Sequence, residues 1–377
     1  MSVNYRKLGE IVELIDERNK ALESSEVLGI SIDKEFMPSV ANTIGTDLSN
    51  YKLLRMNTFA CNPMHVGRDE RLPVSLYKKD IPAIVSPAYF IFRVKNENKV
   101  LPDFLMLIFK RDDFDRNCWF RTDGSVRGGI TWNDICEIEL PVPDLKEQEK
   151  IVNTYKAITK RIQLKQKINE NLEKTAQCLF EKVNQNKENF EEKTIEEISD
   201  AIICGKTPST GIDEYWGKDI PFITIPDMHR NNFITHTERY LSVVGKQSQE
   251  KQTLPAGSIC VSCIATVGLV SITTTISQTN QQINSIICKE GISPFYVFMT
   301  LKGMNEELKR LGAGGSTTLN ISKSLFSSIK IAIPNKKEMD LFENEISPIF
   351  DSILMNEKEI SKLQELKQLV ISRISGM

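Results

Sequence analysis

The chain has 377 residues, which is enough for two ordinary domains with connecting elements. Its hydrophobic content of 40% and charged content of 26% are typical of a soluble globular protein, and no run of 18 apolar residues predicts a membrane-spanning helix. The formal net charge of −2 neither requires nor excludes a nucleic-acid partner, because a protein can gather its positive charge on one face.

The N-terminal residues lack the apolar stretch of a signal peptide, so we expect a cytoplasmic protein that does not bind membranes. In that compartment the eight cysteines are expected to be reduced thiols rather than a disulfide framework.

The first predicted domain covers residues 1–143 and mixes strand-like runs, such as Ala83 to Val94, with turn signals such as Gly128-Gly129. It contains basic side chains together with polar partners, and such sets suit phosphates and base edges. The candidate DNA-binding residues in this domain are Asn57, Asn62, His65, Arg68, Arg71, Arg121, Ser125 and Arg127. The alternative for each of them is an ordinary solvated surface.

A long helix is predicted next, within residues 144–190. Pro141 and Pro143 end the preceding strand, and Asp144 is a plausible N-cap because Glu147 follows three residues later. Seam positions then alternate at spacings of four and three, which is typical of a coiled coil. They are Ile151, Tyr155, Ile158, Ile162, Lys165, Asn169, Leu172, Ala176, Leu179 and Val183.

The second predicted domain covers residues 191–334, with strand-like runs at Ser258 to Ile264 and Ser285 to Cys288. Its loops are rich in hydroxyl, amide and aromatic side chains, and amides suit adenine edges. The candidate DNA-binding residues are Lys206, Thr207, Ser209, Thr210, Tyr215, Trp216, Asn280, Gln281, Gln282, Thr317, Thr318 and Asn320.

A second long helix is predicted within residues 335–377. Its seam positions are Phe342, Ile346, Ile349, Ile353, Asn356, Ile360, Leu363, Lys367, Val370 and Ile374. The first helix carries a net charge of +4 over residues 145–183 and the second carries −2 over residues 336–377. Because isolated helices of this length need a partner, we expect the two helices to pack on each other.

The chain repeats itself once. A shift of 191 residues carries Gly124-Ser125 onto Gly315-Ser316, and it carries the first seam onto the second without a gap. Near the start of each domain the offset is 187, so that Leu8 corresponds to Ile195. A duplicated module predicts approximate internal symmetry and a target that is read in two halves.

Enzyme motifs are weak in this sequence. Gly205-Lys206-Thr207 lacks the glycine that a phosphate-binding loop needs five residues earlier, where Asp200 stands. Cys260 and Cys263 form a single CxxC in strand-like surroundings, which favours packed thiols over a zinc site with four ligands. The sequence therefore predicts no catalytic residues and no metal site.

The chain as a whole resembles the specificity (S) subunits of Type I restriction-modification systems. The strongest motif runs from Gly315 to Pro334 into the second helix, with a weaker copy from Gly124 to Pro143. Residues 205–223 and 279–286 are similar to one class of target recognition domain, and residues 42–70 resemble a different class. The two domains should therefore read different half-sites.

The resemblance implies a mixed α+β fold, in which two strand-rich target recognition domains are joined by two antiparallel helices that act as a spacer. It also implies a non-catalytic subunit that binds double-stranded DNA at a split, asymmetric sequence. Two methyltransferase (M) subunits would dock on the helices, and restriction (R) subunits would join through the complex. S-adenosylmethionine, ATP and Mg²⁺ would bind these partners, so no cofactor is expected in this chain.

Three alternatives stay open from the sequence. The nearest is an S subunit of a modification-only or related system. A protein-interaction scaffold and a stand-alone nuclease with an unrecognised site are the others, and DNA binding with partners, or activity of the chain alone with Mg²⁺, would distinguish them.

Overall fold

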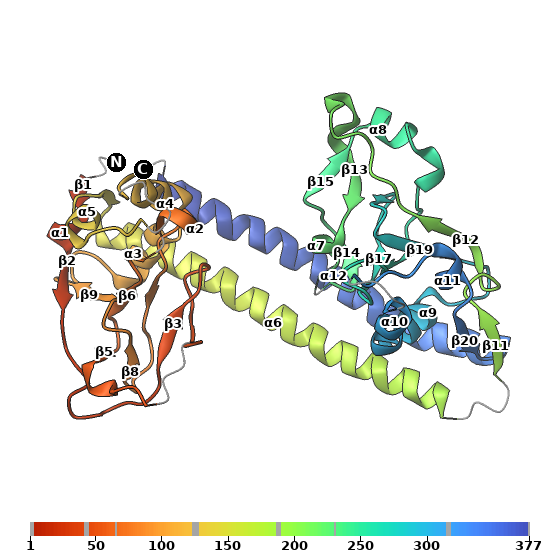
Figure 1. The fold of residues 1–377 in the computed structure, drawn as a ribbon, viewed down its shortest axis with the longest axis horizontal. Helices are drawn as coiled ribbons and strands as arrows, with labels where there is room; N and C mark the ends of the chain where they lie inside the picture. Colours follow the sequence, from red (N-terminus) through yellow and green to blue (C-terminus); the bar gives the residue numbers. More distant parts are fainter. Residues whose placement is uncertain are drawn as a thin grey trace. The chain divides into compact units, whose positions relative to one another are not determined.

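The chain forms two compact units, shown in Figure 1. The computed structural model describes residues 4–40, 45–64, 66–122, 128–185, 190–229, 231–313 and 318–375. Unit 1 contains residues 1–160 and 364–377, and unit 2 contains residues 161–363. Each long helix is thus divided between the two units. The segments predicted from the sequence instead treat each long helix as separate from the strand-rich domain beside it. Across the described residues, no helix combines the length and hydropathy that crossing a bilayer requires.

Unit 1 is rich in short strands. These are β1 (Asn4–Lys7), β2 (Val12–Ile15), β3 (Leu28–Ile30), β4 (Phe36–Pro38), β5 (Lys52–Leu54), β6 (Phe59–Cys61), β7 (Val74–Leu76), β8 (Ala83–Val85), β9 (Phe90–Val94) and β10 (Glu139–Val142). Its helices are α1 (Leu8–Ile11), η1 (Leu48–Asn50), α2 (Val66–Asp69), α3 (Pro102–Phe109), α4 (Asp112–Phe120), α5 (Trp132–Cys136) and the first part of α6 (Leu145–Asn184).

The core of unit 1 lies between an antiparallel sheet and helix α3. The sheet has the order β2-β9-β6-β7. Phe59 and Phe92, opposite each other on β6 and β9, stack at 5.0 Å, and Phe109 of α3 meets both rings edge-on. All three rings are buried, and each removes apolar surface worth roughly 1.5–3 kcal/mol from water.

The predicted strand-like run from Ala83 to Val94 is two strands rather than one. β8 pairs with β5, and β9 pairs with β2 and β6. The chain turns between them, where Tyr89 N donates to Ser86 O at 3.1 Å. Pro87 lies inside this turn and has no N–H to give to a sheet, which explains the break.

Unit 2 has a larger set of strands. These are β11 (Glu191–Thr194), β12 (Ser199–Cys204), β13 (Trp216–Ile223), β14 (Phe233–Ile234), β15 (Arg239–Leu241), β16 (Ile259–Ser262), β17 (Val270–Thr273), β18 (Gln278–Thr279), β19 (Ile283–Cys288) and β20 (Lys330–Ile333). Its helices are the remainder of α6, η2 (Asp213–Tyr215), α7 (Ile225–Met228), α8 (Val243–Gln247), η3 (Glu250–Gln252), α9 (Pro294–Gly303), α10 (Asn305–Gly312), α11 (Lys323–Ser327) and most of α12 (Lys336–Ser375).

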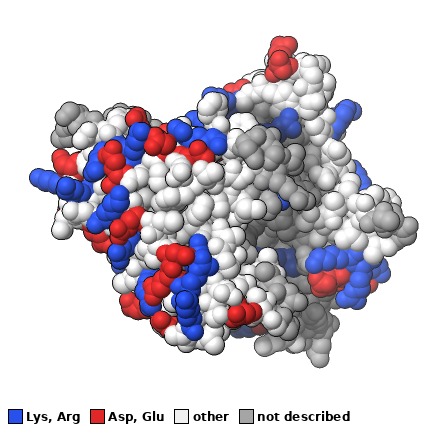
Figure 2. All heavy atoms as spheres, turned by 60° about the vertical axis from the view of Figure 1, so that its left-hand side comes forward, with Lys and Arg blue, Asp and Glu red and all other residues white. Residues whose placement is uncertain are grey.

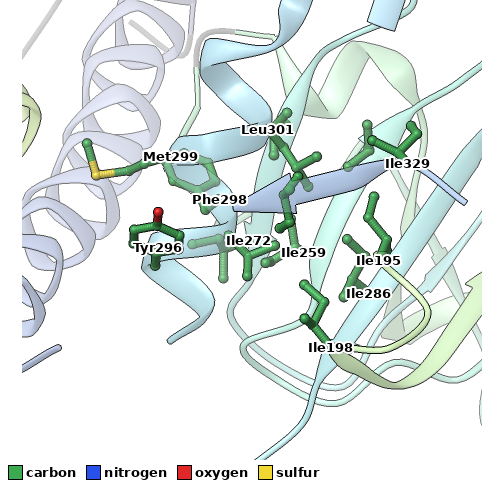
Figure 3. Close-up of a cluster of buried hydrophobic side chains, with 14 of the residues drawn as sticks. Ile195, Ile198, Ile259, Ile272, Ile286, Tyr296, Phe298, Met299, Leu301 and Ile329 are labelled. Atoms are coloured by element: carbon green, nitrogen blue, oxygen red, sulfur yellow. The ribbon is translucent and has the colours of Figure 1, made fainter. Parts of the chain in front are cut away.

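The core of unit 2 is built on a five-stranded sheet of order β12-β19-β16-β17-β14. Figure 3 shows side chains of Ile259, Ile272 and Ile286 from this sheet gathered beside Phe298 and Leu301 of helix α9. These five side chains are at most 2% exposed, so they anchor the sheet to the helix through the burial of apolar surface. A separate sheet, β15-β13-β18, completes the unit.

The two units repeat the same framework. In unit 1, β1 pairs antiparallel with β10, and in unit 2 β11 pairs antiparallel with β20. Their starting pairs, Asn4↔Val142 and Glu191↔Ile333, differ by the predicted offsets of 187 and 191. Helices α6 and α12 each have 40 residues and begin 191 residues apart. The predicted internal repeat is therefore confirmed at the level of secondary structure.

The ends of the repeated elements are set by repeated caps. Asp144 accepts a hydrogen bond from Glu147 N at 2.9 Å, as predicted, and its equivalent Asn335 accepts from Glu338 N at 3.0 Å. Before α5 the side chain of Thr131 caps the helix, and before α11 the equivalent Ser322 does. Such caps satisfy backbone N–H groups that the first turn leaves unpaired.

Helices α6 and α12 pack antiparallel over their shared length in unit 2. Arg161 contacts Glu359, Asn169 contacts Asn356, and the ring of Phe180 lies 6.3 Å from that of Phe342. The residue numbers of the contacting positions thus decrease along α12 as they increase along α6, as in an antiparallel pair. Every predicted seam residue of both helices is buried or half-buried, as a coiled-coil seam requires.

Candidate nucleic-acid interface

In unit 2, the turn after β12 packs against the turn after β18. Gly205 N donates to Ile283 O at 3.1 Å, and Lys206 N donates to Thr279 O at 2.9 Å. A Cβ atom at position 205 would lie 2.1 Å from Asn280 O, so only glycine fits there. Close backbone packing therefore accounts for the glycine of the Gly-Lys-Thr sequence.

Polar side chains of these two turns are fixed by hydrogen bonds to one another. Thr207 Oγ1 donates to Gln281 Oε1 at 2.7 Å, and Asn280 Nδ2 donates to Gln282 Oε1 at 3.0 Å. Lys206 and Gln281 are exposed. These bonds orient the amides before any ligand binds, which is a condition for reading hydrogen-bonding edges selectively.

A third candidate segment joins them through the loop after β16. Cys263 N donates to Gln282 O at 2.8 Å, and Ala265 N donates to Leu319 O at 2.9 Å. Asn320 forms a β-bridge with Ile264, and its side chain is exposed. Thr318 is exposed as well, and Thr317 lies outside the described residues.

The unit 2 candidates therefore converge at one end of a sheet. In the ladders, Cys204 at the end of β12 lies opposite Asn284, and Ser262 at the end of β16 lies opposite Ile283. The polar turns thus extend from the same end of the five-stranded sheet. Residues far apart in sequence are brought together there: Lys206, Thr207, Asn280, Gln281, Gln282 and Asn320.

The two aromatic candidates hold the far end of the loop that begins at Gly205. The indole Nε1–H of Trp216 donates to Ser209 O at 3.3 Å, and the Tyr215 carbonyl accepts from Ser242 N at 3.0 Å. Both rings are half-buried, while Ser209 and Thr210 are exposed between the two fixed ends. The structure thus presents the predicted hydroxyl residues on an anchored loop.

In unit 1, the arginine candidates lie on neighbouring elements. Arg68 belongs to α2 and Arg71 follows it, while Arg121 ends α4, which packs against α2. The two elements are joined because Leu72 N donates to the Asp115 carboxylate at 3.0 Å. All three arginines are exposed, as phosphate contacts require. His65, Ser125 and Arg127 lie outside the described residues.

A buried ion pair supports this region. Lys34 Nζ lies 2.7 Å from Asp115 Oδ1, and both side chains are less than 10% exposed. Burial lowers the pKa of Lys34, and the Asp115 charge opposes that shift. The Lys34–Asp115 pair therefore lies in the interior, beneath the segments that carry the exposed arginines.

The two asparagine candidates of unit 1 lie at opposite ends of β6. Asn62 Oδ1 accepts from Met64 N at 3.1 Å, in the segment that leads into α2. Asn57 instead accepts from Lys78 Nζ at 2.9 Å, and Lys78 also pairs with Asp103. The structure therefore brings Asn62 near the arginines but places Asn57 in a separate network that contains a carboxylate.

On the face drawn in Figure 2, Lys and Arg alternate with Asp and Glu rather than forming one basic field. Arg68, for example, forms an ion pair with Asp69 at 2.6 Å. Arg71, Arg121 and Lys206 have no ion pair within the described ranges, so their charges are available to an anionic ligand.

The thiols of Cys260 and Cys263 are packed in the interior, as their strand-like surroundings predicted. Both are at most 1% exposed, and burial raises the pKa of Cys260 to about 12 and that of Cys263 to about 11. Such thiols are poor nucleophiles. Among the residues with a described position, no three His, Cys, Asp or Glu side chains gather as a metal site.

Sequence reasoning missed two cations beside Trp216. Arg239 stacks over its indole, and Lys218 lines the same hollow. The alternation of Arg239, Tyr240 and Leu241 at a strand edge is a weak signal for this arrangement. The contact depends on which strand pairs with β13, and the sequence does not specify that.

The helix pair contains a central polar layer formed by Lys165, Asn169, Asn356 and Glu359. Asn356 Nδ2 donates to Asn169 Oδ1 at 2.7 Å, Lys165 Nζ donates to Asn356 Oδ1 at 2.8 Å, and Lys165 lies 3.0 Å from Glu359. Both asparagines are less than 10% exposed. Lys165 and Asn356 are also 191 residues apart, so equivalent positions of the repeat contact each other.

The comparisons with known proteins agree on one family. The sequence model described as "Type I restriction modification DNA specificity domain" matches residues 2–174 and again residues 187–369. A curated relative, the HindI specificity subunit of a Type I restriction enzyme from Haemophilus influenzae, is 33% identical over 370 residues, covering 77% of this chain and 80% of the relative. The MjaIX specificity subunit from Methanocaldococcus jannaschii is 33% identical over 178 residues, covering 46% and 40%.

A solved structure supports the fold. The S subunit of a Type I restriction-modification system from M. genitalium aligns with a TM-score of 0.63 at 14% identity, covering 99% of this chain and 96% of that one. The predicted mixed α+β fold with two strand-rich domains is therefore confirmed.

Proposed function

The chain belongs to the Type I restriction-modification DNA specificity family, and from this premise we propose that it recognises a split, asymmetric DNA sequence, with one half-site read by each unit. The observation that carries the proposal is the repeated framework with unlike loops. Two equivalent scaffolds can present loops to two sites on one duplex. Because the loops differ, the two half-sites should differ as well.

The proposal places base contacts on the convergent loops of unit 2. Lys206, Thr207, Gln281 and Asn320 combine a cation with amide and hydroxyl groups on one end of a rigid sheet. Amides read adenine through paired donor and acceptor groups, and cations fix the phosphate register. In unit 1 the corresponding role falls to the region of Arg68, Arg71 and Arg121.

The helix pair is proposed to bind two methyltransferase subunits. Leu164, Ile168 and Met355 are 54%, 46% and 72% exposed beside the central polar layer. Leu164 and Met355 precede the hydrogen-bonded Lys165 and Asn356 by one residue, so they flank the seam at equivalent positions of the repeat. Equivalent apolar contacts suit two copies of one partner. S-adenosylmethionine would be carried by those subunits, and ATP and Mg²⁺ by restriction subunits that join through them.

The decisive experiment is methylome sequencing. The chain is expressed with its methyltransferase partner in a host that lacks DNA methylation, and we expect one split adenine-methylated motif with a fixed gap. A host with the partner alone is the control. An assembled complex that methylates no defined motif would contradict DNA recognition by this chain.

Replacement of the unit 2 loops then tests which unit reads which half. Exchanging residues 279–282 for a glycine-serine sequence of equal length should abolish or relax one half of the motif and leave the other unchanged. Relaxation of both halves would contradict the assignment of one half-site to each unit.

A further inference from the structure

A shallow hollow of about 630 Å³ lies beside the loop that runs from Gly205 to Tyr215. It is lined by Trp216, Gly217, Lys218, Glu238, Arg239 and Tyr240, all of which lie on β13 and β15 or on the segment leading into β15. Of these six residues, only Trp216 was among the DNA-binding candidates predicted from the sequence, and the other five were not. The hollow is therefore a separate feature of unit 2.

Arg239 forms the centre of this surface. Its Cζ atom lies 3.6 Å from the centroid of the Trp216 ring, and Trp216 packs edge-on against Phe222 at 5.4 Å. The indole holds one face of the guanidinium, which leaves the N–H groups at its edge directed away from the stack. No carboxylate forms an ion pair with Arg239 among the residues that the structure describes. The cation is thus preoriented and without a counter-ion there.

A bulge brings a second cation to the hollow. Trp216 and Ile220 both pair with Leu241, so the intervening residues of β13 are displaced from the ladder. Lys218 lies within this bulge and is exposed. Bulges of this kind redirect side chains out of a sheet. Two cations and the single carboxylate of Glu238 therefore line the hollow, which leaves it a net positive charge.

The hollow is connected to the polar loop. The Trp216 indole donates to Ser209 O, so the ring that supports Arg239 also holds the exposed Ser209 and Thr210 in place. An anion bound at Arg239 would lie beside the loop. A DNA duplex presents such anions at regular intervals along its backbone.

We propose that Arg239, stacked on Trp216, and Lys218 bind a backbone phosphate of the DNA next to the half-site read by unit 2. The proposal rests on the proposed function and names a contact that sets the register of the unit on the duplex. A phosphate fits better than a base because the indole already covers a face of the guanidinium, while the free edge donors match phosphate oxygens.

The test measures DNA affinity against salt concentration. Full-length chain assembled with its methyltransferase subunits is titrated with two duplexes, one with the complete motif and one with the unit 2 half-site scrambled. Arg239→Gln and Lys218→Gln are each expected to weaken binding to both duplexes by the same factor. Each should also reduce the slope of log affinity against log salt by about 0.9, the value for one lost phosphate contact.

Two further variants serve as controls. Lys337→Gln removes an exposed cation at the start of α12 and should change neither affinity nor slope. Arg239→Lys retains the charge but not the planar stack, so it should keep the slope and lose part of the affinity. If Arg239→Gln lowers the melting temperature of the complex, the result of Lys218→Gln is used to test the phosphate contact. The Lys218 side chain is exposed on a bulge, so its replacement should not affect folding.

Two outcomes would overturn the phosphate contact. One is an unchanged salt slope in both neutral variants. The other is a loss confined to the complete motif, which would indicate base reading instead. If the wild-type complex binds neither duplex, the proposed function itself fails, and that outcome is distinct from both.

Discussion

Glu357 shows how a single half-buried carboxylate joins the strand-rich part of unit 2 to helix α12. From α12, its Oε1 accepts from Asn232 N at 3.2 Å and its Oε2 accepts from Phe233 N at 3.0 Å. Asn232 in turn donates to Glu173 and accepts from Lys302. Burial raises the pKa of Glu357 to about 7, the hydrogen bonds oppose this shift, and Glu173 adds to it.

This raised pKa predicts a pH-dependent stability. The contribution of Glu357 is fully present below its ordinary pKa of 4.5 and is lost as pH rises through about 7, because the folded state then holds a buried charge. Glu357→Gln should therefore gain stability relative to the wild type between pH 4.5 and 8, by up to about 3 kcal/mol at 1.36 kcal/mol per pKa unit. Urea unfolding at several pH values measures the difference.

Glu359→Gln is the matched control for this experiment. It lies on the same helix, and the partners Lys165 and Arg161 hold the pKa of Glu359 below its ordinary value. Its effect should therefore be constant from pH 5 to 8. A constant effect of Glu357→Gln over that range as well would show that Glu357 does not titrate there.

At the scale of elements, the central polar layer predicts strong coupling between Asn169 and Asn356. Either asparagine replaced alone by leucine leaves its buried partner without that hydrogen bond, which costs about 1–3 kcal/mol. Replacing both restores an apolar seam. Each single variant should therefore have a lower melting temperature than the wild type, and also a lower one than the double variant. Additive losses in the double variant would contradict the coupling.

The exposed apolar side chains on the helices predict the position of partner binding. Leu164→Glu and Met355→Glu should each reduce the number of methyltransferase subunits recovered per chain from two to one, and the double variant should recover none. Mass photometry of the purified complexes gives these ratios. Lys160→Glu, an exposed change on the same helix as Leu164, is the control. Full assembly of the double variant would exclude this surface.

Sequence patterns predicted the helices and the repeat because local signals determine both. Asp144 caps α6 through its own side chain, and the spacing of seam residues specifies the buried face. The site could be predicted only in part. Polar loops are visible in sequence, but the sequence does not show that Asn57 lies at the opposite end of β6 from Asn62, away from the arginines. Arg239 was missed because its stack requires the pairing of β13 with β15.

At the scale of the whole molecule, helix length should control the gap between half-sites. Deleting residues 155–161 and 360–366 removes one heptad from each helix, keeps the seam in phase and retains the central polar layer. Seven residues rise about 10 Å, the length of about three base pairs. The methylated motif should therefore have a shorter gap. Methylome sequencing measures it, and an unchanged gap would contradict the spacer role.

Deletion of one heptad from α6 alone is the comparison. It shifts the seam of one helix against the other and separates Asn169 from Asn356, so assembly or stability should fail. If that variant still methylated a specific motif, the pairing of the two helices would not be what sets the gap between the half-sites.

The hydrogen bond between Lys165 and Asn356 also shows that the two copies of the repeat have diverged at a point where they meet. The two positions correspond under the repeat, yet one carries a lysine and the other an asparagine. A single chain permits such a difference, because each copy of the module can change its residues separately. An asymmetric target would require this freedom, since two identical copies could present only identical loops.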